Sequence, residues 1–364
     1  ARRSGRRSLE LSTGAAALRV DLAGGSLASF TLAEPPLDDR CPRASGSSIN
    51  PLCWDCAVHD GLDVDDVKPR PLGHFLCCDR WGPPTPAELA NGMYYHGEAS
   101  QVEWTVSAST ASSARMGCEL PMAGMTVQRR IEMAPGAAVA VVKETVTNVG
   151  KLCRMYNCVQ HPTVAAPFLG ASTVVDCNGK RGFAQGDNTN TCVEHPEKPT
   201  FEFPATINRA GTAADARTMT GGKDDVQSYE VDPAAELGWV TATSPEVGLV
   251  FGYCWKRADF PWISLWCHSR EDGYTSRGIE FGTTGLHKPF PVLAKHPTLL
   301  GLPTFSALDA EESQTRGYAM FLAEVPKDFV GVENVTMDGQ ELLLSGKASG
   351  GGLSIPLRTG GLGL

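Results

Sequence analysis

The chain has 364 residues, enough for two ordinary domains or for one large all-β domain. Its 32 basic and 41 acidic residues give a formal net charge of −9, which argues against a protein whose whole surface binds nucleic acid or an anionic membrane. A hydrophobic content of 42 % excludes general disorder. No uncharged apolar run approaches the roughly 20 residues that span a bilayer. The 39 glycines and 25 prolines favour loops and strands over helices.

Both ends of the chain are unusual in composition. Residues 1–8 hold four arginines beside serines and no acid, a pattern typical of a processed organelle transit peptide, a trimmed terminus or an ordinary basic tail. Residues 346–364 are so rich in glycine that we expect a tail without a helix or an ordinary strand. Assembly with other proteins through these tails is one hypothesis that the composition leaves open.

Short stretches of alternating or β-branched apolar residues recur along the chain and predict strands. They occupy residues 18–22, 125–133, 139–149, 249–255, 263–267, 318–325 and 332–337. One short helix is expected at 85–90, after Pro84. Because no helices alternate with the strands, a parallel α/β sheet is excluded. We predict an all-β fold, a single large antiparallel β-sandwich domain over 1–364, with long loop excursions near 34–71 and 179–222.

Twelve cysteines in a chain of this length do not predict a disulfide framework. Cys53 and Cys56 form a CxxC pair, but the adjacent Cys77 and Cys78 make a poor second pair for tetrahedral zinc, because neighbouring side chains diverge in an extended backbone. We expect reduced, half-buried thiols, as in a reducing compartment such as the cytoplasm or an organelle.

Three segments place titratable side chains beside aromatics and glycines, namely residues 78–104, 147–169 and 254–290. Five of the seven tryptophans fall in the first and third segments. A site that stacks sugar rings needs flat apolar faces next to hydrogen-bonding side chains. The side chains expected to bind such a substrate are Asp79, Arg80, Asn91, Gln160 and Trp262.

The order of three short motifs resembles the galactose mutarotase-like superfamily, that is, the aldose 1-epimerases and their relatives. The motifs are a loop from Asn91 to His96-Gly97, a strand ending in Gln160-His161-Pro162, and Gly-Ile-Glu-Phe-Gly at 278–282. The resemblance implies a supersandwich of antiparallel strands with a sugar cleft on one face. It covers most of residues 10–340.

The resemblance also implies an activity, the opening and closing of a sugar ring at its anomeric carbon. By position, Glu280 matches the general base, His161 the general acid, and His96 a second histidine that binds the sugar. An acid and a base on opposite sides of one C–O bond suit this chemistry. The substrate is expected to be a sugar or sugar derivative, and neither a metal nor an organic cofactor is implied.

Simpler interpretations stand beside each assignment. His96 and His161 could be histidines that only bind neighbouring backbone or core groups, Glu280 could pair with Arg277, and Asp79 with Arg80 could be a surface ion pair. Glu98, next to the His96-Gly97 step, departs from the epimerase pattern and leaves open a metal site with the two histidines and Glu280. A non-catalytic carbohydrate-binding protein and a structural subunit of a larger complex are the alternative functions. The enzyme hypothesis requires His96, His161 and Glu280 to converge within about 8 Å.

Overall fold

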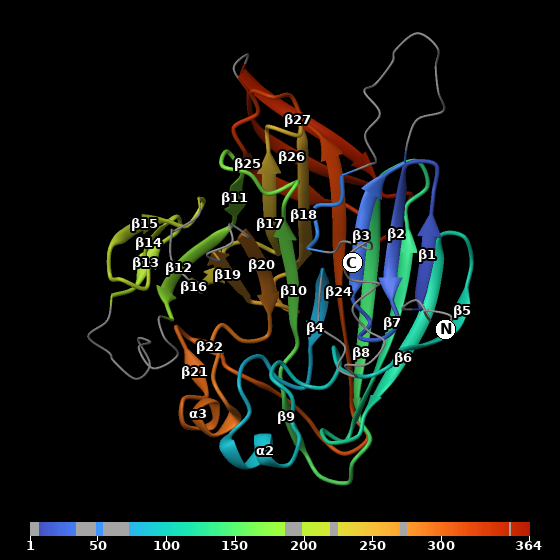
Figure 1. The fold of residues 1–364 in the computed structure, drawn as a ribbon, viewed down its shortest axis with the longest axis vertical. Coiled ribbons are helices and arrows are strands. Elements are labelled where there is room, and N and C mark those ends of the chain that lie inside the picture. Colours follow the sequence, from blue (N-terminus) through green and yellow to red (C-terminus); the bar gives the residue numbers. More distant parts are fainter. Residues whose placement is uncertain are drawn as a thin grey trace, which may run out of the picture.

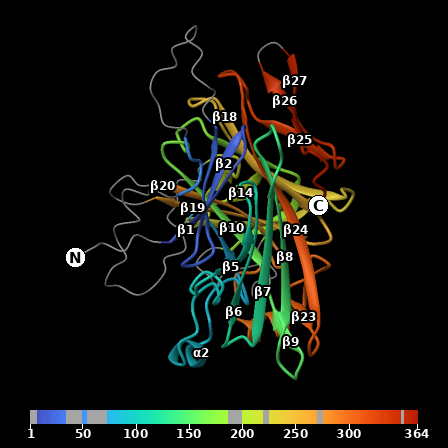
Figure 2. The ribbon, with the colours of Figure 1, turned by 90° about the vertical axis from the view of Figure 1, so that its right-hand side faces the viewer.

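Two large antiparallel sheets face each other in a computed structural model of the protein, which describes residues 7–33, 49–53, 73–185, 199–218, 225–269, 275–348 and 351–364 (Figures 1 and 2). The ten-stranded sheet has the order β1 (Ser8–Ser12), β2 (Ala16–Asp21), β3 (Leu27–Leu32), β4 (His74–Cys77), β10 (Val159–Ala165), β20 (Thr275–Gly282), β19 (Trp262–Ser269), β16 (Asp225–Val231), β12 (Gly179–Ala184) and β13 (Phe201–Glu202). The eight-stranded sheet has the order β11 (Val174–Cys177), β17 (Leu237–Ser244), β18 (Leu249–Lys256), β24 (Ser313–Glu324), β8 (Val139–Asn148), β7 (Met125–Met133), β6 (Ser113–Leu120) and β5 (Thr105–Ser109). The all-β prediction is confirmed.

Smaller elements decorate the two sheets. Two-stranded pairs are formed by β14 (Ala205–Ile207) with β15 (Ala213–Asp215), β21 (Thr298–Leu299) with β22 (Leu302–Pro303), and β9 (Arg154–Tyr156) with β23 (Ser306–Leu308). The short helices α2 (Pro86–Ala90) and α3 (Phe290–Lys295) lie at one end of the molecule, and a three-stranded sheet lies at the other (Figure 1). No helix in the described part of the chain is long and apolar enough to cross a membrane.

The main core fills the space between the two large sheets, because each sheet turns one apolar face inward. Its buried members come from both, for example Leu18 and Phe30 from the ten-stranded sheet and Val127 and Val142 from the eight-stranded sheet. Along β7 every second side chain is buried, and Arg129 takes one of these inward positions. The alternation of buried and less buried side chains expected for this strand therefore continues through Arg129, a charged residue that lies in the core.

The glycine-rich C-terminal run forms strand structure, so the prediction of a tail without a strand is wrong. The strands β25 (Val332–Met337), β26 (Glu341–Ala348) and β27 (Gly351–Arg358) make an antiparallel sheet. Alternate apolar side chains of β27 pack against a second core cluster that also holds Phe329 and Leu344. The alternation of Leu353, Ile355 and Leu357 outweighs the glycines.

The two expected excursions are only partly described. Of residues 34–71, the structure describes 49–53, where Leu52 bridges to Val164 of β10. The stretch 179–222 contains strands β12 to β15 as well as loops, so it is less irregular than predicted. The segments 186–198 and 219–222 and the tail residues 1–6 lie outside the described residues.

Candidate functional site

Two neighbouring strands of the ten-stranded sheet bring Glu280 and His161 together. The antiparallel register pairs Val159 of β10 with Gly282 of β20, and Thr163 with Gly278, so the two titratable side chains share one face of the sheet. Nε2 of His161 lies 3.3 Å from Oε1 of Glu280. Both residues are buried, with 8 % of His161 and 1 % of Glu280 exposed.

Each side chain of this pair is held by a second contact. Nδ1 of His161 lies 3.2 Å from the hydroxyl oxygen of Thr163, on the same face of β10. The ring of His161 also stacks on Phe75 of β4, with centroids 4.3 Å apart. The other carboxylate oxygen of Glu280, Oε2, accepts a hydrogen bond of 2.8 Å from the indole N–H of Trp81. The pair is thus fixed from three elements of the fold.

His96 lies beside the pair, and its backbone has a left-handed conformation that residues other than glycine rarely adopt. Its φ is +66°, and its ring centroid is 5.4 Å from that of His161. Nδ1 accepts a hydrogen bond from the backbone N–H of Gly82, whose carbonyl in turn accepts from the N–H of His96. A neutral His96 therefore carries its hydrogen on Nε2, which has no partner among the described residues. His96 thus lies in one cluster with His161 and Glu280, and the roles predicted for the three residues stay predictions.

A third histidine, His287, extends this cluster. Its ring lies 5.3 Å from that of His96 and 4.7 Å from the indole of Trp81, between centroids. Nε2 of His287 is 3.2 Å from the hydroxyl of Tyr95, a half-exposed residue. Neither His287 nor Trp81 was assigned a role from the sequence, and only their places in the motif-bearing segments pointed to them.

Burial sets the charge of the pair. It raises the pKa of Glu280 well above its usual value, against the opposing effect of the hydrogen bond from Trp81. Burial lowers the pKa of His161 to about 3, with a smaller contribution from His287. Both shifts favour the uncharged forms, that is, a protonated Glu280 beside a neutral His161. Burial, and next His287, also lowers the pKa of His96, which keeps that ring neutral.

Asp79, Arg80 and Asn91 lie together, but not against the pair. Arg80 is bound to the carboxylates of Asp79 and of Glu88 in α2, at 3.0 and 2.8 Å. Asn91 caps the end of α2, where its amide donates to the carbonyl of Ala87. Their polar contacts among the described residues include neither Glu280 nor His161. These contacts hold the three residues to one another or to α2, and their role in substrate binding stays a prediction.

Gln160 also points away from the candidate site, since successive side chains of a strand face opposite ways. Its amide nitrogen donates to Glu144 at 2.6 Å, and its amide oxygen lies 2.9 Å from Nε2 of His74. Glu144 accepts in turn from Arg129 at 2.7 Å. All four side chains are buried between the sheets, so Gln160 belongs to the core and not to a substrate-binding surface.

Trp262 is on the same face of the sheet as Glu280 but is completely buried. Its side chain packs in a small cluster with Phe183, Leu286 and Leu293, and no part of it is exposed. A fully covered ring cannot stack on a sugar, so the role predicted for Trp262 does not fit. Trp266 lies four residues further along the same strand and is partly exposed. Its ring centroid is 6.1 Å from that of His161.

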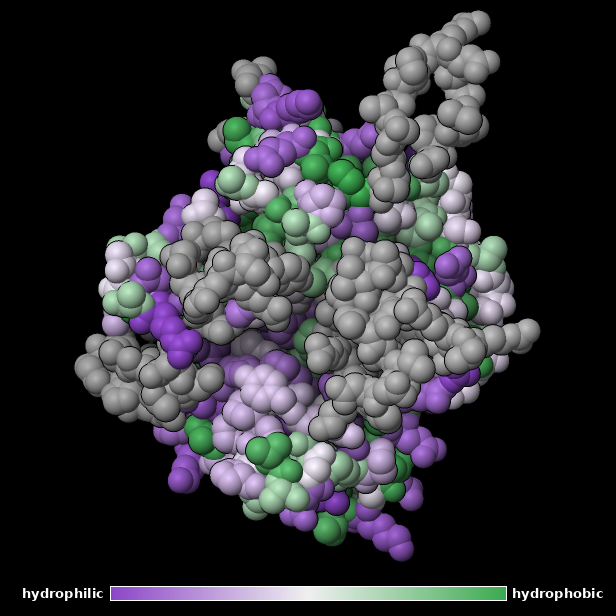
Figure 3. Space-filling view, in the orientation of Figure 1, coloured by the Kyte–Doolittle hydropathy of each residue, from purple (hydrophilic) through white to green (hydrophobic). Residues whose placement is uncertain are grey.

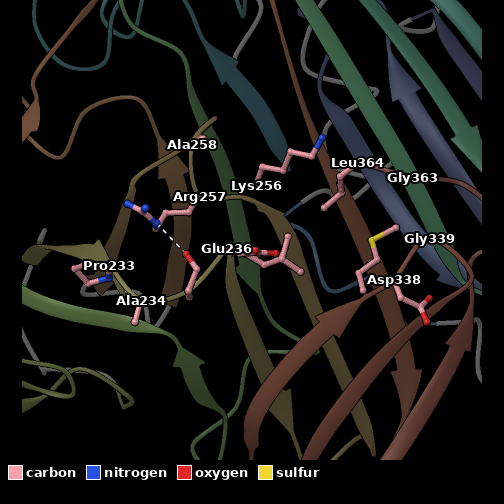
Figure 4. Close-up of a pocket in the computed structure, with 13 residues that line it drawn as sticks. Pro233, Ala234, Glu236, Lys256, Arg257, Ala258, Asp338, Gly339, Gly363 and Leu364 are labelled. Carbon is pink, nitrogen blue, oxygen red and sulfur yellow. Dashed lines mark hydrogen bonds between the residues drawn. The ribbon is translucent and has the colours of Figure 1, made fainter.

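The face of the molecule that carries β10, β19 and β20 is hollowed near its centre, and hydrophilic side chains line the hollow (Figure 3). Two cavities lie elsewhere. One of about 550 Å³ is lined by Asp79, Arg80 and Asn91 together with residues of β9 and Phe290. Another of about 670 Å³ lies between the C-terminal residues and the ends of β17 and β18, where Arg257 donates to the carbonyl of Ala235 (Figure 4).

The described residues contain no group of three or more side chains placed to hold a metal ion. Glu98, the carboxylate considered for such a site, instead accepts hydrogen bonds from the backbone N–H groups of Met122 and Ala123. No disulfide joins the nine cysteines that the structure describes, and eight of them are buried. Cys56 of the CxxC pair lies outside the described residues.

No protein-family model matches the chain, and no curated protein matches it in sequence. Solved structures do match its fold. A galactose mutarotase related enzyme from Lactobacillus acidophilus superposes with a TM-score of 0.59 at 10 % identity, over 88 % of this chain and 98 % of the other. A galactose mutarotase-like protein from Lactobacillus casei gives a TM-score of 0.56 at 13 % identity, over 87 % of this chain and 100 % of the other.

An aldose epimerase homologue from C. elegans matches in the same way, with a TM-score of 0.55 at 9 % identity over 88 % of this chain and 99 % of the other. These structures are covered almost end to end, so the agreement extends over the whole sandwich and not over one motif. At such low identity the agreement concerns the fold. The chain has the galactose mutarotase-like fold.

Proposed function

We propose that the protein is an aldose 1-epimerase-like enzyme that interconverts the anomers of a sugar or sugar derivative. The observation that carries the proposal is the buried pair of Glu280 and His161, one carboxyl oxygen against one ring nitrogen at 3.3 Å. The names of the structural neighbours, a galactose mutarotase related enzyme and an aldose epimerase homologue, support the same reaction class.

The proposed reaction begins when the shared proton moves from Glu280 to His161. The carboxylate then takes the proton of the anomeric hydroxyl while the imidazolium protonates the ring oxygen. The bond between the anomeric carbon and the ring oxygen breaks, and a free aldehyde forms. After rotation of the aldehyde, the reverse transfers close the ring on its other face.

The proton count of the pair supports this scheme. It holds one proton before ring opening, on His161, and one proton afterwards, on Glu280. Burial raises the pKa of Glu280 and lowers that of His161, so it favours the second arrangement, which accompanies the open-chain sugar in this scheme. His96 is proposed to bind a sugar oxygen through its Nε2–H, the donor that its contact with Gly82 leaves available.

The experiment is anomer equilibration followed by polarimetry, with a panel of hexoses, pentoses and sugar phosphates. We expect the wild-type protein to accelerate equilibration of at least one sugar, and the Glu280→Gln variant to lose about a hundredfold or more in kcat/KM. Gly352→Ala, on an open stretch of β27, serves as the control variant that keeps wild-type activity.

The alternative functions give different outcomes in the same experiment. A carbohydrate-binding protein would bind a sugar of the panel, as measured by calorimetry, without any acceleration by the wild-type protein. A structural subunit would neither bind nor turn over any of them. Either outcome would contradict the proposed activity.

A further inference from the structure

The two oxygens of the Glu280 carboxyl group have different partners. Oε1 faces Nε2 of His161 at 3.3 Å, whereas Oε2 accepts the indole N–H of Trp81 at 2.8 Å. Trp81 is 2 % exposed, so this hydrogen bond is shielded from water. Oε1 is therefore the oxygen that faces His161, while Oε2 is held by Trp81.

The loop that carries Trp81 is held on both sides of it. Before it, Arg80 is buried and bound to Asp79 and Glu88. After it, Gly82 has a φ of +109°, and a Cβ there would lie 3.2 Å from the backbone carbon of His287. A side chain at residue 82 would crowd that contact, so the close approach requires glycine.

The indole itself has little room to turn. Its ring meets the ring of His287 edge-on, with centroids 4.7 Å apart and an interplanar angle of 80°. On its other sides it packs with the buried Phe75, Cys77 and Val159 of β4 and β10. The donor is thus presented to Glu280 by a preformed arrangement of the loop and the sheet.

We propose that Trp81 is a positioning residue, whose indole N–H holds Oε2 of Glu280 so that Oε1 alone acts on the substrate. The inference rests on the proposed function, because it assigns the reacting oxygen of the proposed base. The hydrogen bond from Trp81 also favours the charged form of Glu280, because a donor stabilises a carboxylate, and so it opposes the effect of burial on the Glu280 carboxyl group.

The other groups that face Glu280 do not replace this donor. His161 lies against the opposite oxygen, and Cys77 of β4 is a buried thiol whose pKa is raised, chiefly by burial and then by the charge of Glu280. His287 and His96 contact Trp81 and His161, respectively, and both have a lowered pKa, so they are neutral at physiological pH. Among these groups, only Trp81 donates to Oε2 in the described structure.

The test uses the indole ¹H–¹⁵N resonances of the wild-type protein and the kinetics of Trp81→Phe. In the wild type, the Trp81 indole resonance should shift with pH as Glu280 titrates, while that of Trp262 should not. Trp262 is a matched reference, because it is also buried and its Nε1 has no hydrogen-bond partner among the residues that the structure describes. A Trp81 resonance that does not respond to pH, or that moves no more than that of Trp262, overturns the proposal.

The kinetic arm compares Trp81→Phe with the control Trp262→Phe, which removes a similar volume and no hydrogen bond. We expect Trp81→Phe to lower kcat about tenfold or more, to leave KM within about twofold, and to move the basic limb of the pH profile up by about one pH unit. Equal losses in the two variants without a shift of the limb would show a merely structural role and contradict the proposal.

The two arms separate this inference from the proposed function. If the wild-type protein has no epimerase activity but its Trp81 resonance follows the titration of Glu280, the proposed function fails and the contact to Oε2 stands. If the protein is active and the resonance does not respond to pH, the activity stands and the role of Trp81 is refuted. The resonance arm uses the unaltered chain, so it does not depend on how Trp81→Phe folds.

Discussion

Glu280 and His161 lie on neighbouring strands of one sheet, with Oε1 of the carboxyl group 3.3 Å from Nε2 of the ring. Trp81 holds the other carboxyl oxygen of Glu280, and Thr163 contacts the other ring nitrogen of His161. Burial raises the pKa of Glu280 and lowers that of His161, so both shifts favour a proton on Glu280 and an uncharged His161. A general acid and a general base that share one proton can exchange roles without taking a proton from water. This property is what the proposed ring opening and closing requires.

Gly278, on the same strand as Glu280, leaves the space that the carboxyl group occupies. A Cβ at this position would lie 2.9 Å from Oε1 of Glu280 and 3.2 Å from Cβ of Trp266. We expect Gly278→Ala to displace the carboxyl group and lower kcat by about tenfold to a hundredfold. Circular dichroism should show an unchanged strand content. A variant with wild-type kcat would show that the position of Oε1 is not critical.

The buried ion pair between the sheets should matter for stability and not for catalysis. Arg129 donates to Glu144 at 2.7 Å and lies over the ring of Trp104 at 4.2 Å. Arg129→Met leaves a buried carboxylate without its cation, and we expect a loss of about 3 kcal/mol in the free energy of unfolding, measured with urea. The double variant Arg129→Met/Glu144→Leu should recover much of that loss. A double variant less stable than the single one would contradict this view of the pair.

Buried histidines should make the fold sensitive to acid. Burial lowers the pKa of His74 from 6.5 to about 3, so below pH 6.5 the unfolded chain binds a proton that the folded protein does not. Stability is therefore lost as the pH falls from about 6.5 toward 3. Buried His161 and His287, whose pKa values are also lowered to about 3, act in the same direction, whereas Glu280, with its raised pKa, acts in the opposite one.

The contribution of His74 can be measured by urea unfolding at pH 7 and pH 5. We expect the wild type to lose stability between the two, and His74→Gln to lose about 2 kcal/mol less over the same interval. His74 is suited to this test because it lies in the core, bonded to Gln160 and away from Glu280. An identical pH dependence in the two proteins would show that His74 does not titrate differently on unfolding.

The sequence allowed the architecture to be predicted because apolar alternation survives single exceptions. The strand at 125–133 was recognised despite Arg129, which proved to be an inward residue of the same pattern. The glycine content of the C-terminal run argues against a strand, but the alternation of Leu353, Ile355 and Leu357 favours one, and the strand forms. Composition of a segment is a weaker guide than the order of its apolar residues.

The cluster of His96, His161 and Glu280 was easier to predict than its surroundings. His96, His161 and Glu280 stand in motifs whose order could be recognised, and they do converge. The directions of Arg80 and Gln160 could not be predicted, since each follows from whether its neighbour, Trp81 or His161, faces the site. The direction of Gln160 is decided by the register of β10 with β4 and β20, which pairs residues about 80 to 120 positions apart.

The most direct test of the proton-sharing pair is a double-mutant cycle of kcat/KM for anomer exchange, measured by NMR exchange spectroscopy on the best sugar of the panel. We expect Glu280→Gln and His161→Gln each to lose about a hundredfold or more, and the double variant to lose little beyond either single one, because the two groups act as a unit. Fully additive losses, or near wild-type activity in either single variant, would contradict the account.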